Sequence, residues 1–344
     1  MQAGTRIAQR YVVDRPLGTG GLATALRVRD LVFEADVALK VVAAAGADDV
    51  LRREFLALRA VHHPRIVRVH DFGYWRDGGA VRAFYTSAIV EGVDLERFAR
   101  GRTWQELARP IGDVLSALGS LHRRGLLHGD VHPGNVLVEE RTGHGVLIDL
   151  SCSRPLETGR TEDVSGTKGF IAPERLEGIV HRTADLYALG ISLRRLDVAL
   201  PAKVARAVSG FVAPRPEDRP QSAEEAAELL GVPWTRPPAS DLLGSVLVGR
   251  DAALGRARSV LDAILTRTRG ARVVSIRGDD GTGRTRLLEE IKTEAQLRMD
   301  AVLVRGDRAG ALETMLAMVL GDSVDVSSTT AVLRAVERLT ARRD

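Results

Sequence analysis

The chain has little cysteine, no long apolar run and little net charge. Cys152 is its one cysteine in 344 residues, which excludes an internal disulfide framework and favours a reducing compartment. The start lacks an apolar secretory signal, and no stretch reaches the roughly 18 apolar residues of a membrane span. The net charge of +4 is small and its basic residues are scattered. We expect a cytoplasmic protein with neither a membrane nor a nucleic acid as partner.

Lysine is scarce as well. Of the 49 basic residues, only Lys40, Lys168, Lys203 and Lys292 are lysines. A retained lysine therefore points to a position that needs a compact ammonium group. The balance of 44 % hydrophobic and 27 % charged residues is typical of a globular protein with a sizeable core, and the length allows two or three domains.

The apolar pattern changes along the chain. Residues up to about 94 read as strands with turn signals between them, interrupted by one helical stretch at 48–61. The spacing beyond is mainly helical, with short strands at 135–140 and 145–150. We therefore predict an α+β fold in which a small β-rich lobe precedes a larger helical lobe.

Five short motifs follow one another. They are a glycine-rich turn at 18–21, VALK at 37–40, HGDVHPGN at 128–135, an aspartate at 149 after a buried strand, and APE at 172–174. In this order and spacing the chain resembles the bacterial, Hanks-type branch of the serine/threonine protein kinase family over residues 11–230. The resemblance implies a two-lobed kinase fold, with an N-lobe at about 11–91 and a C-lobe at about 92–230.

The resemblance also implies a chemistry. The family moves the γ-phosphoryl group of ATP, with Mg²⁺, to a Ser or Thr hydroxyl of a protein substrate. By the family's pattern, Asp130 orients the hydroxyl and accepts its proton, while Asn135 and Asp149 hold the metal. Lys40 contacts the α- and β-phosphates, and Glu54 on the next helix is its ion-pair partner. Each could alone be a capping or solvated residue, but that reading does not explain the whole series.

The glycine-rich turn is a weak signal by itself, because a plain hairpin uses the same residues. Within the series, it resembles the lid over the phosphates, where small residues let backbone N–H groups approach closely. The residues that the resemblance places around the nucleotide are Leu17, Gly18, Thr19, Gly20, Gly21, Ala23, Ala25, Ala38, Lys40, Ala88, Val90 and Leu137.

Other motifs are expected to be structural. The family pattern pairs Glu174 with Arg219 inside the lower lobe, and it uses Asp185 to brace the catalytic loop. These three residues distinguish protein kinases from small-molecule kinases.

Several positions depart from the family. Gly129 replaces an arginine, His132 replaces the lysine near the γ-phosphate, and Ser151 replaces a glycine. The stretch 190–219 is short and lacks the helix on which protein substrates often dock. Two alternatives therefore stay open: a nucleotide-binding pseudokinase scaffold, and a small-molecule kinase, since HGDVHPGN is similar to the loop of aminoglycoside and choline kinases.

A second region follows a proline-rich stretch, which we interpret as a linker at 231–245. Residues 246–344 are predicted to contain a helix at 248–268, a strand at 271–278, a glycine-rich turn, a helix at 286–299 and a strand at 301–306. Gly278, Gly283, Arg284 and Thr285 have phosphate-loop spacing, and the region resembles a partial AAA-like P-loop ATPase module. Arg284 replaces the lysine of that motif, so we expect phosphate binding without ATP hydrolysis, or only a glycine-rich turn in a remnant domain.

Overall fold

The computed structural model describes most of the chain. The described residues are 1–20, 23–43, 47–77, 79–162, 164–235, 247–266 and 274–298. They form two compact units, the first made of 1–52, 70–89 and the described residues from 247 on, the second of 53–69 and 90–235. No helix in this described part of the chain has the length and apolar character needed to cross a membrane.

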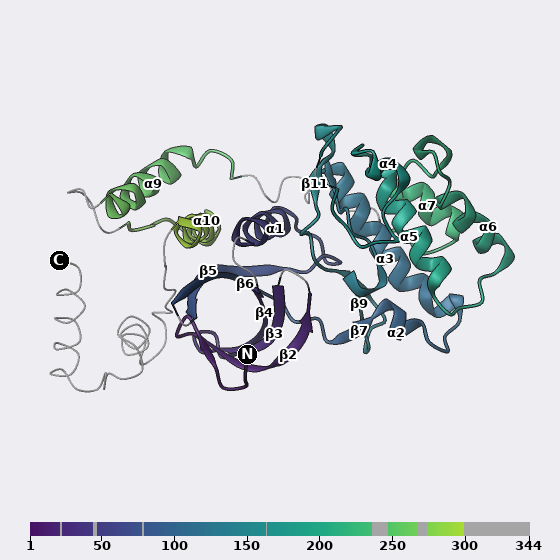
Figure 1. Cartoon of the computed structure of the whole chain (residues 1–344). Helices are drawn as coiled ribbons and strands as arrows, with labels where there is room; N and C mark the ends of the chain where they lie inside the picture. Colours follow the sequence, from purple (N-terminus) through teal and green to yellow (C-terminus); the bar gives the residue numbers. More distant parts are fainter. Residues whose placement is uncertain are drawn as a thin grey trace. The chain divides into compact units, whose positions relative to one another are not determined.

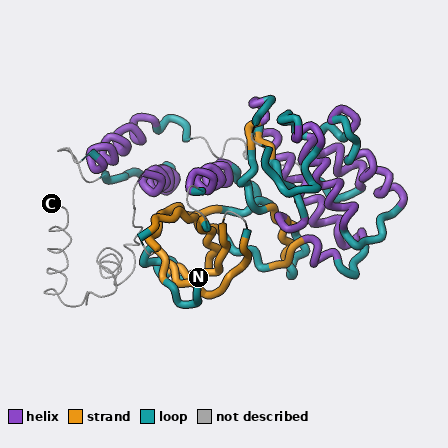
Figure 2. Tube along the Cα trace, in the orientation of Figure 1, coloured by secondary structure: helices purple, strands orange, loops and turns teal. Residues whose placement is uncertain are grey.

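The first unit is built on a six-stranded sheet in the order β1-β2-β3-β4-β6-β5. Figure 2 shows these strands curling round tightly. The strands are β1 (Arg6–Ile7), β2 (Tyr11–Thr19), β3 (Ala23–Asp30), β4 (Ala35–Val42), β5 (Val69–Asp77) and β6 (Ala80–Ser87). The N-lobe strands predicted from the alternating pattern are therefore formed, and β5 is an edge strand.

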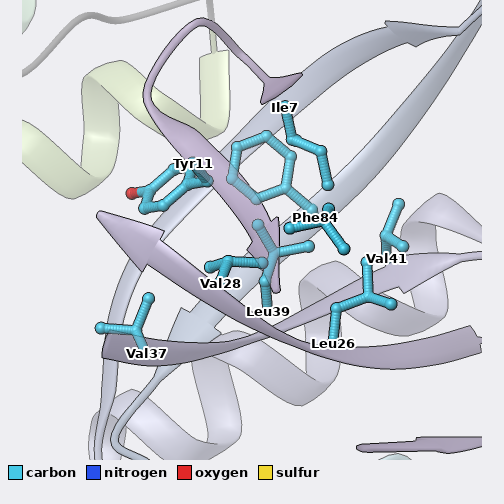
Figure 3. Packing of buried hydrophobic residues seen from close by; sticks show 9 residues of the cluster. Ile7, Tyr11, Leu26, Val28, Val37, Leu39, Val41 and Phe84 are labelled. Atoms are coloured by element: carbon cyan, nitrogen blue, oxygen red, sulfur yellow. The ribbon is translucent and has the colours of Figure 1, made fainter. Parts of the chain in front are cut away.

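The two faces of strand β4 carry different kinds of residue. Val37, Leu39 and Val41 are buried in the core cluster, which also contains Tyr11, Leu26 and Phe84 (Figure 3). Because successive side chains of a strand point to opposite faces, Ala38 and Lys40 lie on the other face. The same alternation that buries the core thus presents one lysine away from it.

Three helices belong wholly or partly to the first unit. They are α1 (Asp48–Ala60), α9 (Asp251–Leu265) and α10 (Arg284–Arg298), labelled in Figure 1. The helices predicted on either side of the glycine-rich turn are confirmed. The strand predicted at 271–278 is wrong over 274–278, the described part, because no described strand lies beside it to complete a ladder. The strand predicted at 301–306 lies outside the described residues.

The second unit is mainly helical. Its helices are α2 (Leu95–Ala99), α3 (Trp104–Arg123), α4 (Pro173–Leu176), α5 (Thr183–Arg195), α6 (Ala202–Phe211) and α7 (Ala223–Leu230), with 3₁₀ turns η1 (Pro133–Asn135), η2 (Leu156–Thr158) and η3 (Pro216–Asp218). Its short strands are β7 (Gly92–Asp94), β8 (Leu126–Leu127), β9 (Val136–Glu139), β10 (Gly145–Leu147) and β11 (Arg154–Pro155). Only residues 196–201 join α5 to α6.

A buried ion pair fixes the base of this unit. Arg219 donates two hydrogen bonds to the Glu174 carboxylate, Nη1 to Oε1 at 2.7 Å and Nη2 to Oε2 at 2.8 Å. Both residues are buried, and the remaining guanidinium N–H groups reach backbone carbonyls. A bidentate Arg–carboxylate pair with its other donors satisfied is the geometry in which a buried pair survives desolvation. The pairing predicted from the sequence is confirmed.

Helix α3 carries a small-residue face against which the chain after α7 packs. A Cβ on Gly112 would clash with the backbone carbonyl of Pro233, and one on Gly119 would lie 2.7 Å from the Trp234 ring. Between them, the Ser116 hydroxyl donates to the Thr235 carbonyl at 2.7 Å. Residues 233–235, the start of the predicted linker, are therefore fixed on α3.

Replacing Gly112 by alanine should destabilise the second unit by about 1–3 kcal/mol, because an added methyl group must displace backbone from a packed surface. Gly210→Ala in α6 is the matched control. Its Cβ would meet open space, so alanine should raise stability by up to about 1 kcal/mol through helix propensity. Urea unfolding measures both. Equal midpoints for the two variants would contradict the packing described.

Candidate active site

The loop between β8 and β9 gathers polar groups around one carboxylate. The backbone N–H of Thr167 donates to Asp130 Oδ1 at 2.7 Å, and Asn135 Nδ2 lies 3.3 Å from Oδ2. Asn135 Nδ2 also donates to the Asp130 carbonyl at 2.9 Å, which closes the loop on itself. His132 Nε2 lies 3.6 Å from Asp130 Oδ2. Three of the predicted site residues are thus brought together in the second unit.

The charge state of Asp130 follows from these contacts. Partial burial by itself would raise its pKa, but His132 and the Thr167 N–H stabilise the ionised form more strongly. The pKa of Asp130 is therefore lowered from its usual range. At neutral pH the group is a carboxylate that can accept a hydrogen bond from a hydroxyl.

His132 opens the 3₁₀ turn η1. Its Nδ1 accepts a hydrogen bond from the Gly134 N–H at 3.1 Å, so the ring caps the turn that carries Asn135. An accepting Nδ1 leaves the proton of a neutral imidazole on Nε2, the atom that faces Asp130. The ring of Phe170 stacks at a tilt on the other side, with centroids 5.7 Å apart.

The two predicted metal ligands, Asn135 and Asp149, lie on neighbouring segments of the second unit. The Asn135 carbonyl accepts from the N–H of Ile148, the residue before Asp149. Because the Asn135 amide nitrogen faces Asp130, its amide oxygen points the other way. Asp149 has a φ of 64°, and its Oδ1 accepts from the Ser151 N–H at 2.9 Å. An amide oxygen and a carboxylate are the hard oxygen donors that suit a divalent cation with waters and phosphates as further ligands.

A buried aspartate on α5 holds the loop between β8 and β9. Asp185 Oδ2 accepts from the His128 N–H and Oδ1 from the Gly129 N–H, each at 2.9 Å. His122 Nε2 on α3 lies 2.7 Å from Oδ2. The brace predicted for Asp185 is confirmed, and despite full burial these contacts lower its pKa.

Gly129 is required by its own conformation. Its φ is 82°, in the left-handed region that favours glycine, and a Cβ there would clash with the Cys152 carbonyl. The family's arginine is thus replaced by the one residue this backbone accommodates without strain. Gly129, Asp130, Thr167, Phe170 and Asp185 line a cavity in this unit.

The first unit carries its own group of predicted nucleotide residues. Lys40 on β4 pairs across the sheet with Ala25 on β3, and Ala38 pairs with Ser87 on β6. Cross-strand partners share a face, so Ala25, Ala38 and Lys40 lie on the face opposite the apolar core. Small residues beside a lysine leave room for a flat ligand on that face.

The remaining predicted residues are placed as follows. The hairpin between β2 and β3 is formed or flanked by Leu17, Gly18, Thr19, Gly20 and Ala23. Two residues, Ala88 and Val90, follow β6, and Leu137 lies on β9. Gly21 lies outside the described residues. Glu54 is buried on α1, and its pairing with Lys40 stays a prediction.

The predicted phosphate-loop residues lie on an exposed turn before α10. Gly281 and Gly283 have φ values of 80° and 82°, and the helix begins at Arg284. Arg284 is ion-paired with Asp280 of the same turn. Arg250 Nη2 donates to the Thr282 carbonyl at 2.7 Å. The position of the motif's lysine is therefore occupied by an arginine already engaged by a carboxylate.

Sequence reasoning missed two groups of this site. The Thr167 N–H is a backbone donor, and backbone donors carry no residue signature. His122 was also missed; its only signal was a histidine in the last turn of a long amphipathic helix.

Comparison with known proteins agrees with this geometry. The protein kinase domain family matches residues 11–202, more than half of the chain. Serine/threonine-protein kinase pkn3 of Myxococcus xanthus is 31 % identical over 60 % of this chain and 41 % of its own length. PrkC of Bacillus subtilis is 29 % identical over 57 % and 31 %, and PknB of Mycobacterium tuberculosis is 30 % identical over 56 % and 33 %.

A solved structure, "PpkA-294 apo form", shares the fold. Its TM-score is 0.55 at 21 % identity, and the match covers 67 % of this chain and 99 % of that one. The chain belongs to the protein kinase family, and it carries the domain that these bacterial serine/threonine kinases share. The family uses ATP and a divalent metal ion. The chain spans less than half the length of the three bacterial relatives.

Proposed function

We propose that the chain is a serine/threonine protein kinase that uses ATP and Mg²⁺, with a domain at 11–230. The observation that carries the proposal is the arrangement around Asp130. An ionised carboxylate, an amide and a backbone N–H are held together by a loop that a buried aspartate braces. Such an arrangement suits a reaction that depends on positioning and on charge rather than on a covalent intermediate.

Asp130 would act on the substrate hydroxyl. Its lowered pKa keeps it ionised near neutrality, so it orients the hydroxyl by accepting its hydrogen bond. The Thr167 N–H holds Oδ1 and the Asn135 amide holds Oδ2, so both oxygens are oriented while each can accept a further hydrogen bond. The hydroxyl proton would pass to the carboxylate as the hydroxyl oxygen bonds to the γ-phosphorus and the bond to the β–γ bridging oxygen breaks, with ADP as the leaving group.

Asn135 and Asp149 would hold Mg²⁺, and Lys40 would contact the phosphates. The metal supplies neutralisation of charge on the β- and γ-phosphates when it is bound. Ala25, Ala38 and Leu137 would pack against the base, the backbone of Ala88 and Val90 would hydrogen-bond to it, and Ala23 would belong to the lid over the phosphates.

His132 would act as a positioning group. Its Nδ1 accepts from the Gly134 N–H, and its Nε2 lies 3.6 Å from Asp130 Oδ2, so the ring links the turn η1 to the carboxylate. An imidazole in this place does not reproduce the fixed charge of the family's lysine. Ring ¹⁵N chemical shifts identify which ring nitrogen accepts, and a neutral ring with its proton on Nδ1 would refute this arrangement.

The test compares the wild type with Asp149→Ala in a radiolabelled ATP assay with Mg²⁺. Incorporation of label into Ser or Thr of the chain, lost by about 100-fold or more in the variant, is the expected result. Thermal stabilisation by nucleotide without labelling would favour the pseudokinase scaffold instead. Turnover that requires an added hydroxylated metabolite would favour a small-molecule kinase.

We also propose that the turn at 278–285 is a degenerate phosphate loop of an AAA-like module. The spacing, the positive φ of Gly281 and Gly283, and the helix starting at Arg284 support this proposal. The ion pair of Arg284 with Asp280 favours weak phosphate binding without hydrolysis. Titration with inorganic triphosphate should shift the amide resonances of Gly283 and Thr285; unmoved resonances at millimolar ligand would refute the proposal.

A further inference from the structure

Helix α10 caps the open edge of the kinase sheet. On edge strand β5, the His70 carbonyl accepts from Lys292 Nζ at 3.3 Å, and the Phe72 N–H donates to Gln296 Oε1 at 3.3 Å. Figure 1 draws α10 beside β5. Lys292 and Gln296 are four positions apart, so they share one face of the helix. Unpaired edge groups are a liability that proteins cover, and here two side chains take the place of a neighbouring strand.

The same two side chains meet a buried carboxylate. Asp71 Oδ1 lies 2.8 Å from Lys292 Nζ and accepts from Gln296 Nε2 at 3.0 Å. Asp71 Oδ2 lies 2.9 Å from Arg10 Nη2, and Arg10 also pairs with Asp30 at 2.6 Å. Arg10, Asp30 and Asp71 are each at most 5 % exposed. Two carboxylates thus face two cations, and without Lys292 the buried group would carry a net negative charge.

The electrostatics of Asp71 show how much it depends on both cations. Burial alone would raise its pKa, but Arg10 and then Lys292 lower it to about 2. The Asp71 N–H in turn donates to Thr86 Oγ1 at 3.2 Å on β6, next to Ser87. The network therefore runs from α10 through β5 to the end of β6.

The choice of lysine fits this position. Lys292 is one of four lysines among 49 basic residues. Its ammonium reaches Asp71 at 2.8 Å, Glu289 at 2.7 Å and the His70 carbonyl at 3.3 Å, and its side chain is 12 % exposed. Three diverging acceptors around one point suit a compact group with three N–H donors, whereas a guanidinium presents its donors in one plane.

We propose that strand β5 is an intramolecular docking site for α10, through which the segment beyond the linker completes the kinase sheet and sets its stability. The partner that the site fits is a helix with a lysine and a glutamine one turn apart, and residues 284–298 supply it. The inference stands apart from phosphoryl transfer, so its failure would leave the proposed function untouched. It adds residues 284–298 to a folded kinase unit whose predicted domain ends at residue 230 and whose family match ends at residue 202.

The first test uses Lys292→Met in the full chain. Methionine keeps an unbranched stem but leaves Asp71 with one cation too few. Removing one partner of a buried pair is strongly destabilising, so the Phe72 amide should exchange with solvent roughly 100-fold faster. Lys203→Met is the matched control, because Lys203 is exposed on α6 of the other unit. Exchange at Phe72 that changes less than twofold in Lys292→Met would overturn the proposal.

Two further variants cover the case in which Lys292→Met does not fold. Gln296→Leu keeps every charge and removes the acceptor of the Phe72 N–H together with the hydrogen bond to Asp71 Oδ1, so exchange at Phe72 should rise about tenfold; unchanged exchange would overturn the docking. Lys292→Met with Asp71→Asn leaves the neutral Arg10–Asp30 pair. This double variant should unfold at a higher temperature than Lys292→Met alone, and an equal or lower midpoint would overturn the charge argument.

Discussion

Replacing Asp130 by asparagine is expected to lower phosphoryl transfer by about 10²–10⁴-fold, the range for loss of a positioned proton acceptor. Asparagine keeps the shape of the side chain but offers one oxygen in place of two. Its amide nitrogen would face either the Thr167 N–H or the Asn135 amide, and both are donors. The variant should still fold and still bind nucleotide.

The measurement is the initial rate of label transfer from ATP, with nucleotide binding followed by thermal shift. Asp197→Asn is the control, because Asp197 is exposed in the connection between α5 and α6. A rate for Asp130→Asn within threefold of the wild-type rate would remove Asp130 from the reaction. A loss that appears only together with lost nucleotide binding would instead indicate a structural role.

Replacing Asp185 by alanine should lower the free energy of unfolding of the second unit by about 3–5 kcal/mol. Two backbone N–H groups and His122 converge on this carboxylate, and its removal leaves them buried without their acceptor. Asp185→Asn keeps one acceptor oxygen and should lose less. Because the pKa of Asp185 is lowered, its contribution is present above about pH 4 and is lost as the pH falls below its ordinary value.

Urea unfolding at pH 7 checks the size of this effect, and a pH series checks its sign. A midpoint for Asp185→Ala within 1 kcal/mol of wild type would contradict the brace. The folded fraction of the variant should also transfer phosphate more slowly, since the N–H groups of His128 and Gly129 would no longer be held by Asp185.

The sequence indicated the candidate site residues better than it indicated the groups that hold them in place. Asp130, Asn135 and Asp149 could be proposed because each lies in a motif of fixed local spacing. Thr167 and His122 were not, because a backbone donor has no residue signature and the His122–Asp185 contact spans 63 positions. A sequence motif describes residues that are close along the chain, whereas the Thr167 N–H and His122 contact the site only in the folded structure.

In the region after residue 246 the helices were predicted correctly, but one strand was not. Periodicity predicted the helices that become α9 and α10, since apolar spacing is local. The strand at 271–278 was predicted from an apolar run, yet a strand also needs a partner, which the run cannot supply. The contact between Lys292 and Asp71 joins residues 221 positions apart in the chain, so no local sequence pattern could have indicated it.

The glycine before Asp130 couples two loops of the second unit. An arginine at position 129 would meet both an unfavourable φ and the Cys152 carbonyl. Such a side chain would therefore cost stability unless the turn after Asp149 also moved. A family-like arginine could not be restored at this position by one substitution alone, because the backbone around Cys152 would have to change with it.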